Sequence, residues 1–221
     1  MDYELVKLGA EFLNISAEEF VKRIGNNVQR GIDDWNKYGF GEYDKFTEAN
    51  IYGLVSFNDT ERMENLMFPI KNVKNLNILD FGCGIGTLGF ELSTNNNVDM
   101  YDVKGKTNEF AKYSADKLNK NVNFIEYDDI FKKKYDLIIT TDVLEHLKEP
   151  ITVADKLLKQ LTPRGLFLTT GLLFSTGPSM PMHLEENMQY RQKFDELMRQ
   201  VSRIIFFMST RKETIFLHMV K

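Results

Sequence analysis

Cysteine and long apolar runs are both scarce in this chain. Cys83 is the one cysteine among 221 residues, so no internal disulfide can form and an oxidising compartment has no support. No apolar run approaches the roughly 20 residues that a membrane-spanning helix needs. Residues 1–4 lack the basic-then-apolar pattern of a signal peptide. We therefore expect a cytoplasmic protein without a membrane span, and the sequence leaves its oligomeric state open.

Clustered positive charge is missing as well. The 28 basic side chains are outnumbered by 32 acidic ones, and the net charge is −4. The lysine run at residues 132–134 is short and fits a solvated turn. Because binding to nucleic acid depends on clustered Lys and Arg, we expect no nucleic-acid partner.

The pattern of the chain changes near residue 74. Residues 1–73 predict a helical extension, in which Ser16 and Glu19 form a capping box ahead of an apolar helix face. This extension is also dense in aromatic side chains, which form either a lid over a site or a small accessory core. The aromatic residues in question are Trp35, Tyr38, Phe40 and Tyr43.

Residues 74–221 predict the main domain, in which strands and helices alternate. Strands are expected at residues 76–81, 98–101, 122–125, 135–140 and 166–170. Helices are expected at residues 87–93, 106–119, 151–161 and 186–200, and a turn at residues 163–165. Residues 203–208 and 214–220 predict a closing hairpin. The pattern favours an α/β fold: a Rossmann-like, doubly wound, mostly parallel seven-stranded sheet that ends in an antiparallel hairpin.

The most informative segment follows the first predicted strand. Asp80 is followed by glycine at every second position, Gly82, Gly84 and Gly86. Glycine lets the backbone take positive φ and lets a ligand approach closely. A helix that begins near residue 87 would direct its first free N–H groups at that ligand. The segment therefore predicts a nucleotide-like cofactor site at the carboxyl end of the first strand.

Two cofactors fit this site. Residues 84–89 match the dinucleotide pattern G-x-G-x-x-G, and Asp102 follows at a distance suited to a ribose of a nicotinamide cofactor. The second interpretation uses more of the sequence. Asp102, at the end of the second strand, could accept both ribose hydroxyls, and Asp128 or Asp129, after the third strand, could accept from an adenine amino group.

Two segments carry a resemblance to a known superfamily. Residues 79–86, Leu-Asp-Phe-Gly-Cys-Gly-Ile-Gly, resemble the first motif of class I S-adenosylmethionine-dependent methyltransferases. Residues 142–147, Asp-Val-Leu-Glu-His-Leu, resemble the segment after the fourth strand in the small-molecule branch, which includes quinone-biosynthesis enzymes. The resemblance covers about residues 74–221. It implies in-line transfer of a methyl group from S-adenosylmethionine to a small-molecule O, N or C nucleophile.

The resemblance also implies roles for the cofactor residues. Gly82, Gly84 and Gly86 would lie against the methionine part. Asp80 would orient the loop or receive the ammonium group, with a plain helix-capping role as the alternative. Asp102 is expected to hold the ribose.

The remaining cofactor residues follow later strands. Val103, together with Ile85 and Ile130, could pack on the adenosine. Asp128 is favoured over Asp129 for the adenine. Asp142 would begin the segment that faces the sulfonium.

Two histidines are candidate catalytic residues. The imidazole of His146 or His183 could take a proton from a substrate group, although either residue could instead fix a loop. No metal site is expected, because residues 169–171 are Thr-Thr-Gly where catechol-type enzymes carry carboxylate ligands. Residues 1–73 and 172–186 are expected to choose the substrate. A catalytically silent cofactor-binding protein and a nicotinamide-dependent oxidoreductase remain as alternatives.

Overall fold

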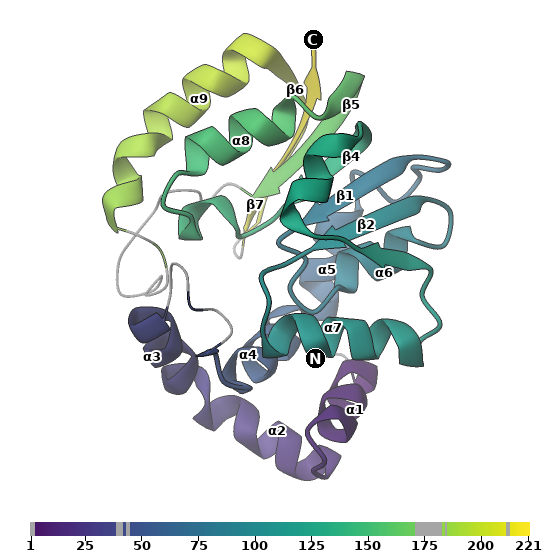
Figure 1. Cartoon of the computed structure of the whole chain (residues 1–221), viewed down its shortest axis with the longest axis vertical. Helices are drawn as coiled ribbons and strands as arrows, with labels where there is room; N and C mark the ends of the chain where they lie inside the picture. The colour runs from purple at the N-terminus through teal and green to yellow at the C-terminus, as the bar shows by residue number, and fades with distance from the viewer. Residues whose placement is uncertain (1–2, 39–41, 43–44, 171–182, 184, 211–212) are drawn as a thin grey trace.

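A computed structural model describes residues 3–38, 42, 45–170, 183, 185–210 and 213–221 (Figure 1). Five helices precede the sheet: α1 (Tyr3–Phe12), α2 (Ala17–Asn26), α3 (Val28–Tyr38), α4 (Ala49–Phe57) and α5 (Thr60–Met67). The later α-helices are α6 (Thr87–Leu92), α7 (Lys106–Lys117), α8 (Pro150–Leu158) and α9 (Tyr190–Val201). Short 3-10 helices are η2 (Tyr127–Lys132), η3 (Leu144–His146) and η4 (Glu185–Gln189).

A mixed sheet of seven strands, in the order β3-β2-β1-β4-β5-β7-β6, organises the molecule. Its strands are β1 (Asn77–Phe81), β2 (Asn97–Tyr101), β3 (Val122–Phe124), β4 (Tyr135–Thr140), β5 (Leu161–Thr170), β6 (Ser202–Ser209) and β7 (Thr214–Val220). The first five strands pair in parallel, and β7 pairs antiparallel with both β5 and β6. The predicted fold class, including the closing hairpin, is confirmed.

The central strands are apolar on both faces because helices cover both faces. Leu79 and Ile138 point to a core that α8 and α9 close, and these two helices lie side by side (Figure 1). Ile78 and Ile139 point to the opposite core, which α5 and α6 close. Alternate residues of one strand therefore hold two helical layers in place.

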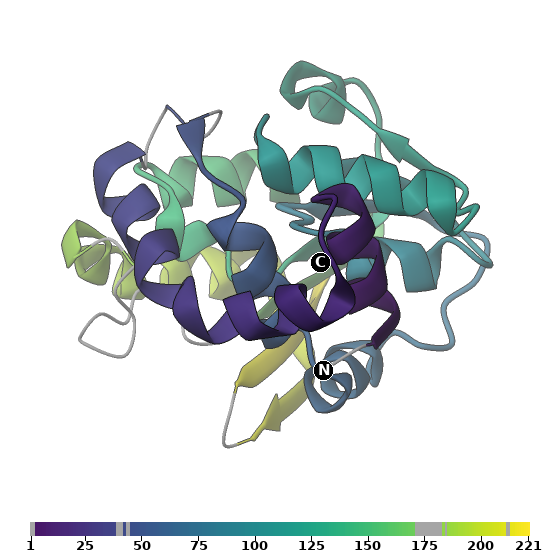
Figure 2. The same cartoon turned by 90° about the horizontal axis from the view of Figure 1, so that it is seen from below.

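The N-terminal helices share a third core with the main domain. Phe20 of α2 packs on Tyr52 of α4 with ring centroids 4.6 Å apart. Ile85 and Phe110, both from the part after residue 74, are fully buried in the same cluster. Figure 2 shows α1, α2 and α3 following one another across the lower side of the molecule. The division of the chain at residues 73/74 stays a prediction.

One predicted turn is wrong. Residues 163–165 do not separate α8 from the next strand, because β5 begins already at Leu161 and continues to Thr170. Its pairing with β4 shifts register, since Tyr135 pairs with Leu161 and Leu137 with Leu166. Arg164 takes a φ of 64° inside this irregularity. A bulge therefore accommodates Pro163, which lacks the N–H of a regular ladder.

No helix among the described residues has the length and apolar character needed to cross a lipid bilayer.

The serine half of the predicted capping box begins α2, while the Glu19 carboxylate pairs with Arg23. The Ser16 side chain accepts a hydrogen bond from Glu19 N at 3.1 Å. We expect Ser16→Ala to lower the free energy of unfolding by about 1 kcal/mol, because an N–H group of the first turn loses its partner. Urea unfolding measures this, with Ser56→Ala on the exposed surface of α4 as the control. Equal stability of the two variants would contradict the capping role.

Candidate active site

The glycine loop between β1 and α6 has the backbone conformation that its sequence predicts. Gly82, Gly84 and Gly86 have φ values of 75°, 56° and 89°. A Cβ at Gly82 would lie 2.3 Å from Val143 Cγ2, so only glycine fits there. A Cβ at Gly84 would meet Leu54 Cδ1 at 3.6 Å and no other described atom within 4 Å. The loop is thus packed on one side and accessible beside Gly84.

Asp80 connects this loop to helix α6. Its Oδ2 accepts a hydrogen bond from Gly89 N at 3.1 Å, in the first turn of the helix. Burial raises the pKa of Asp80 to about 7; the Gly89 hydrogen bond opposes the rise, and the nearby Asp102 charge adds to it. The hydrogen bond to Gly89 N is the contact expected of a helix-capping Asp80. A contact between Asp80 and a cofactor stays a prediction.

Asp102 fixes the glycine loop from the end of β2. Its Oδ2 accepts from Gly84 N at 2.6 Å and its Oδ1 from Val103 N at 2.7 Å. Tyr101 O accepts from Gly82 N at 2.8 Å. Burial raises the pKa of Asp102 to about 6, against these two backbone hydrogen bonds. Four predicted residues, Asp102, Val103, Gly82 and Gly84, are therefore brought together.

The two acidic candidates after β3 lie on η2. Asp128 is exposed. Asp129 Oδ1 accepts from Lys132 Nζ at 2.6 Å, and this hydrogen bond lowers the pKa of the Asp129 carboxyl. The exposure of Asp128 and the hydrogen bond of Asp129 do not decide which of the two residues would reach an adenine. The apolar candidates Ile85 and Ile130 are fully buried in separate cores.

Asp142 belongs to a buried ionic network that the sequence analysis missed. Its carboxylate pairs with Arg62 of α5, and its Oδ1 accepts from Thr170 Oγ1 at 3.1 Å. Arg62 Nη1 donates to Asn58 Oδ1 at 2.7 Å, and Arg62 Nε lies 3.4 Å from Glu213 Oε2. The Arg62 side chain is only 7% exposed. No sequence signal links residues from four distant segments.

His146, His183 and Glu145 converge at the end of η3. The rings of the two histidines meet edge to face, with centroids 5.0 Å apart. His183 Nε2 lies 3.9 Å from Glu145 Oε1, and the Trp35 ring lies 4.8 Å from the His146 ring. The structure thus brings both predicted histidines into one cluster. Phe40, Tyr43 and residues 172–182 of the predicted substrate segments lie outside the described residues.

Glu145 is the functional residue that sequence reasoning missed. Its side chain is fully buried, and neither carboxyl oxygen has a hydrogen bond of normal geometry to a described residue. Burial and then the Asp142 charge raise the pKa of Glu145 to about 8, while the backbone N–H groups of Glu145 and Val143 oppose the rise. The available signal was an acidic residue directly before a candidate histidine.

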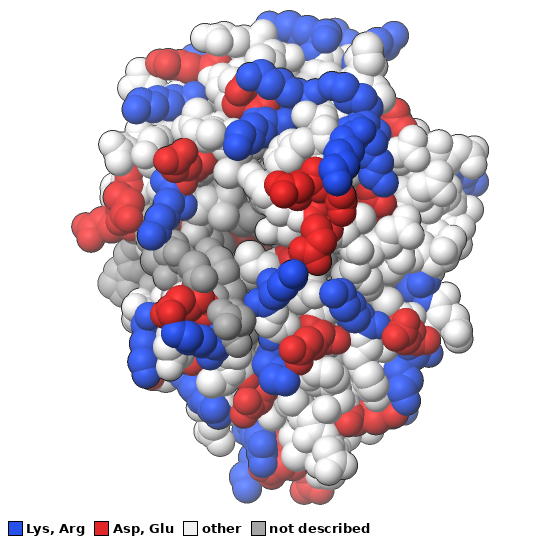
Figure 3. Space-filling view, viewed as in Figure 1, with Lys and Arg blue, Asp and Glu red and all other residues white. Residues whose placement is uncertain are grey.

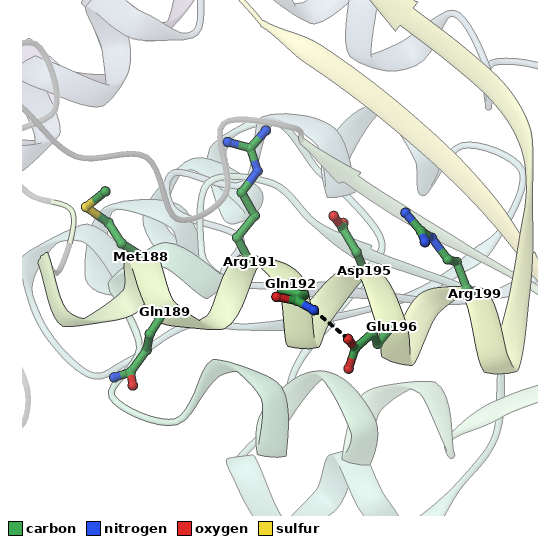
Figure 4. A pocket seen from close by; sticks show the side chains of 7 residues that line it. All are labelled: Met188, Gln189, Arg191, Gln192, Asp195, Glu196 and Arg199. Atoms are coloured by element: carbon green, nitrogen blue, oxygen red, sulfur yellow. Dashed lines mark hydrogen bonds between the residues drawn. The ribbon is translucent and has the colours of Figure 1, made fainter.

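Asn187 of η4 anchors the backbone of this cluster. Its Nδ2 donates to Glu145 O at 3.0 Å and to Leu147 O at 2.7 Å. A separate depression of about 480 Å³ lies along α9 (Figure 4). Gln192 donates to Glu196 within that helix, and the lining includes neither the glycine loop nor the histidine cluster. This depression is therefore not part of the candidate site.

The comparisons with known proteins agree with this geometry. Residues 79–167 match the family model described as a methyltransferase domain. That segment begins in β1, includes the glycine loop and Asp102, and ends in β5. Residues 79–167 are therefore similar to a methyltransferase domain, in agreement with the resemblance to class I S-adenosylmethionine-dependent methyltransferases that the motifs indicate.

Three curated relatives act on different substrates. A malonyl-[acyl-carrier protein] O-methyltransferase of Ilyobacter polytropus is 26% identical over 80% of this chain and 65% of its own length. A tRNA U34 carboxymethyltransferase of Nautilia profundicola is 23% identical over 72% of this chain and 53% of its own. A ubiquinone biosynthesis O-methyltransferase of Rickettsia typhi is 26% identical over 60% and 52%. The chain thus spans only about half to two thirds of these relatives.

A solved structure supports the fold. Magnesium protoporphyrin IX methyltransferase of Synechocystis, solved with bound S-adenosylmethionine, superposes with a TM-score of 0.55 at 21% identity. The likeness covers 86% of this chain and 91% of that one. At this identity the likeness shows a shared fold and carries no information on the substrate.

The Arg62 network allows a direct comparison of buried and exposed ion pairs. We expect Arg62→Met to lower the free energy of unfolding by about 3–5 kcal/mol, because Asp142 and the buried Glu213 lose their cation. The exposed pair of Arg23 with Glu19 is the control, and Arg23→Met should cost at most about 1 kcal/mol. Urea unfolding measures both variants, and similar losses would contradict the structural role of Arg62.

Proposed function

We propose that this chain transfers the methyl group of S-adenosylmethionine to a small-molecule nucleophile by in-line displacement. The observation that carries the proposal is the glycine loop, which Asp102 holds at the carboxyl end of β1 inside the matched methyltransferase segment. The sulfonium methyl is already activated, so the protein mainly aligns nucleophile, methyl and sulfur and excludes water. Positioning of this kind supplies roughly 7–11 kcal/mol.

In this proposal the loop and two carboxylates bind the cofactor. The accessible side of Gly84 would face the methionine part. Each Asp102 oxygen already accepts one backbone N–H and keeps a second lone pair for a ribose hydroxyl. Asp80 would hold the start of α6 in place, and Val103 with either Asp128 or Asp129 would border the adenosine.

The substrate would lie on the side of the histidine cluster. His146 or His183 could take the substrate proton as a free base, and Asp142 at the end of β4 would border the sulfonium. Trp35 brings the N-terminal extension to this place through its contact with His146. This contact supports the assignment of residues 1–73 as a part of the substrate site.

A small molecule is favoured over a nucleic acid by charge. Acidic side chains outnumber basic ones, and Figure 3 shows the two signs interspersed over the face that it draws. The malonyl-[acyl-carrier protein] and ubiquinone-biosynthesis relatives support a small substrate, whereas the tRNA relative makes a transfer RNA the competing substrate. We propose a cytoplasmic location, because a single cysteine gives no support to an oxidising compartment.

Calorimetric titration tests the cofactor first. We expect micromolar binding of S-adenosylmethionine and S-adenosylhomocysteine and none of NAD. Binding of NAD alone would overturn the proposal in favour of hydride transfer. Turnover is then measured as the release of S-adenosylhomocysteine in the presence of a panel of small molecules and a panel of tRNAs. Cofactor binding without turnover on any panel would favour a catalytically silent protein.

The raised pKa of Asp102 predicts that cofactor affinity depends on pH. Ribose hydroxyls donate to the ionised carboxylate, so binding should strengthen as the pH rises. We expect about tenfold per pH unit well below pH 6 and a plateau above about pH 8, where Asp102 and Asp80 are both ionised. Asp102→Asn should weaken binding at pH 8 by roughly 10- to 100-fold. Asp116→Asn on exposed α7 is the control, and an unchanged affinity in Asp102→Asn would refute the ribose assignment.

Gly84 tests the glycine loop separately from the carboxylates. Gly84→Ala places a Cβ at positive φ on the accessible side of the loop, at a backbone cost of about 1–2 kcal/mol. We expect cofactor affinity to fall at least tenfold while the protein stays folded. Gly25→Ala, where a Cβ meets no described atom within 4 Å, should keep full affinity. Full affinity in both variants would contradict an approach of the cofactor beside Gly84.

A further inference from the structure

We propose that Glu145, His146 and His183 bind one divalent transition-metal ion of the zinc class, and that this ion holds a hydroxyl group of the substrate. The second half of this inference rests on the proposed methyl transfer. The first half stands on the geometry of the three side chains alone.

The three side chains can reach a common ion. One ligand atom from each residue lies within 4.8 Å of the others, and Glu145 Oε1 is 3.9 Å from His183 Nε2. Zinc lies about 2.0–2.2 Å from nitrogen and oxygen ligands, so two ligands of one ion are at most about 4.4 Å apart. Small side-chain rotations therefore close the site.

Glu145 supplies the strongest reason for a cation. Its carboxyl group is fully buried, and no described donor reaches either oxygen with normal geometry. A buried carboxyl group without partners costs free energy that a bound cation would recover. Arg62 does not meet this need, because its guanidinium is engaged by Asp142, Asn58 and Glu213.

The local backbone is built to hold the cluster. Glu145 and His146 are adjacent on η3, and Asn187 donates to the carbonyl oxygens on both sides of His146, those of Glu145 and Leu147. The Trp35 ring packs on His146 from the opposite end of the chain. The ligand atoms are thus positioned by contacts outside the ligand set, as is common in metal sites.

The donor set selects the kind of metal. Two imidazoles and one carboxylate suit zinc and its neighbours, whereas magnesium and calcium prefer oxygen ligands alone. Three protein ligands leave a fourth position open, which is the arrangement of catalytic zinc sites. This site differs from the catechol-type position that the sequence analysis considered, because Asp142 is paired with Arg62 and Thr169 is buried.

The open position defines a substrate class. A hydroxyl oxygen bound to the ion loses its proton to solvent more easily, since the metal acts as a Lewis acid. The resulting oxygen anion attacks the sulfonium methyl, an O–C bond forms, and the C–S electron pair returns to sulfur as S-adenosylhomocysteine. The substrate would therefore be a small phenol, enol or alcohol, and the two histidines would be ligands in place of free bases.

Metal binding is tested on the untagged, chelator-stripped full chain. Zinc chloride is titrated by calorimetry, and cobalt(II) by its visible absorption. Trp35 is the one tryptophan of the chain, so its fluorescence reports on an ion at His146. We expect one equivalent bound with micromolar or tighter affinity, quenching of Trp35 by cobalt, and no displacement by millimolar magnesium.

Variants show whether these three residues are the ligands. Glu145→Gln and His183→Ala should each weaken zinc binding at least tenfold, and Glu149→Gln, an exposed acid nearby, should not. His218 is retained in every variant, so zinc bound by this histidine alone would still be bound in all of them. Should Glu145→Gln fail to fold, His183→Ala still decides the matter. Unchanged affinity in a folded His183→Ala variant, or displacement of cobalt by magnesium, would overturn the site.

The same samples separate this inference from the proposed function. Titration with S-adenosylmethionine tests the cofactor site independently of zinc. Cofactor binding without zinc binding would refute the metal site and leave methyl transfer intact. Zinc binding without cofactor binding would refute methyl transfer and leave the metal site intact. If both hold, chelation should abolish turnover of hydroxyl substrates, and stoichiometric zinc should restore it; turnover unaffected by chelation would refute the role of the ion.

Discussion

The hydrogen bond from Gly84 N to Asp102 is the contact on which the proposed cofactor site depends. It joins the loop after β1 to the end of β2, and Asp80 joins the same loop to the first turn of α6. Asp80 is buried and Asp102 is half-buried, and this loss of solvent raises the pKa values of both carboxyls. A ligand that donates hydrogen bonds or carries positive charge relieves that burial. Binding of such a ligand at the carboxyl edge of the sheet is therefore favoured, because it stabilises the ionised form of both carboxyls.

A second set of contacts surrounds the place where we propose that substrate chemistry occurs. Arg62 pairs with Asp142 across 80 positions of the chain, and the Asp142 charge in turn helps to raise the pKa of Glu145. Glu145 is left buried beside two imidazoles, with Trp35 of α3 against them. The N-terminal helices therefore contact the glycine loop through the shared core with Ile85 and the histidine cluster through Trp35. The sequence resemblance covers only residues 74–221, so the position of these helices near the candidate site is known from their packing alone.

Local patterns explain which parts could be predicted. The strands, the glycine loop and the closing hairpin were predicted correctly, because apolar periodicity and glycine spacing are properties of short segments. The turn at residues 163–165 was wrong, since pairing with β4 absorbed Pro163 in a bulge. Arg62 and Asn187 were missed for a related reason. Their partners are distant in sequence, and a lone arginine or asparagine carries no pattern.

The sequence by itself determined the fold class and the kind of cofactor. The fold class follows from the alternation of strands and helices over residues 74–221, and the cofactor follows from the resemblance of residues 79–86 and 142–147 to methyltransferase motifs. Only the tertiary structure decided that Glu145 is buried without a normal hydrogen bond to any described residue and that His146 and His183 meet beside it. Burial is a property of what other segments place around a side chain. A carboxylate that appears as one of 32 acidic residues in the sequence becomes chemically distinct only after folding.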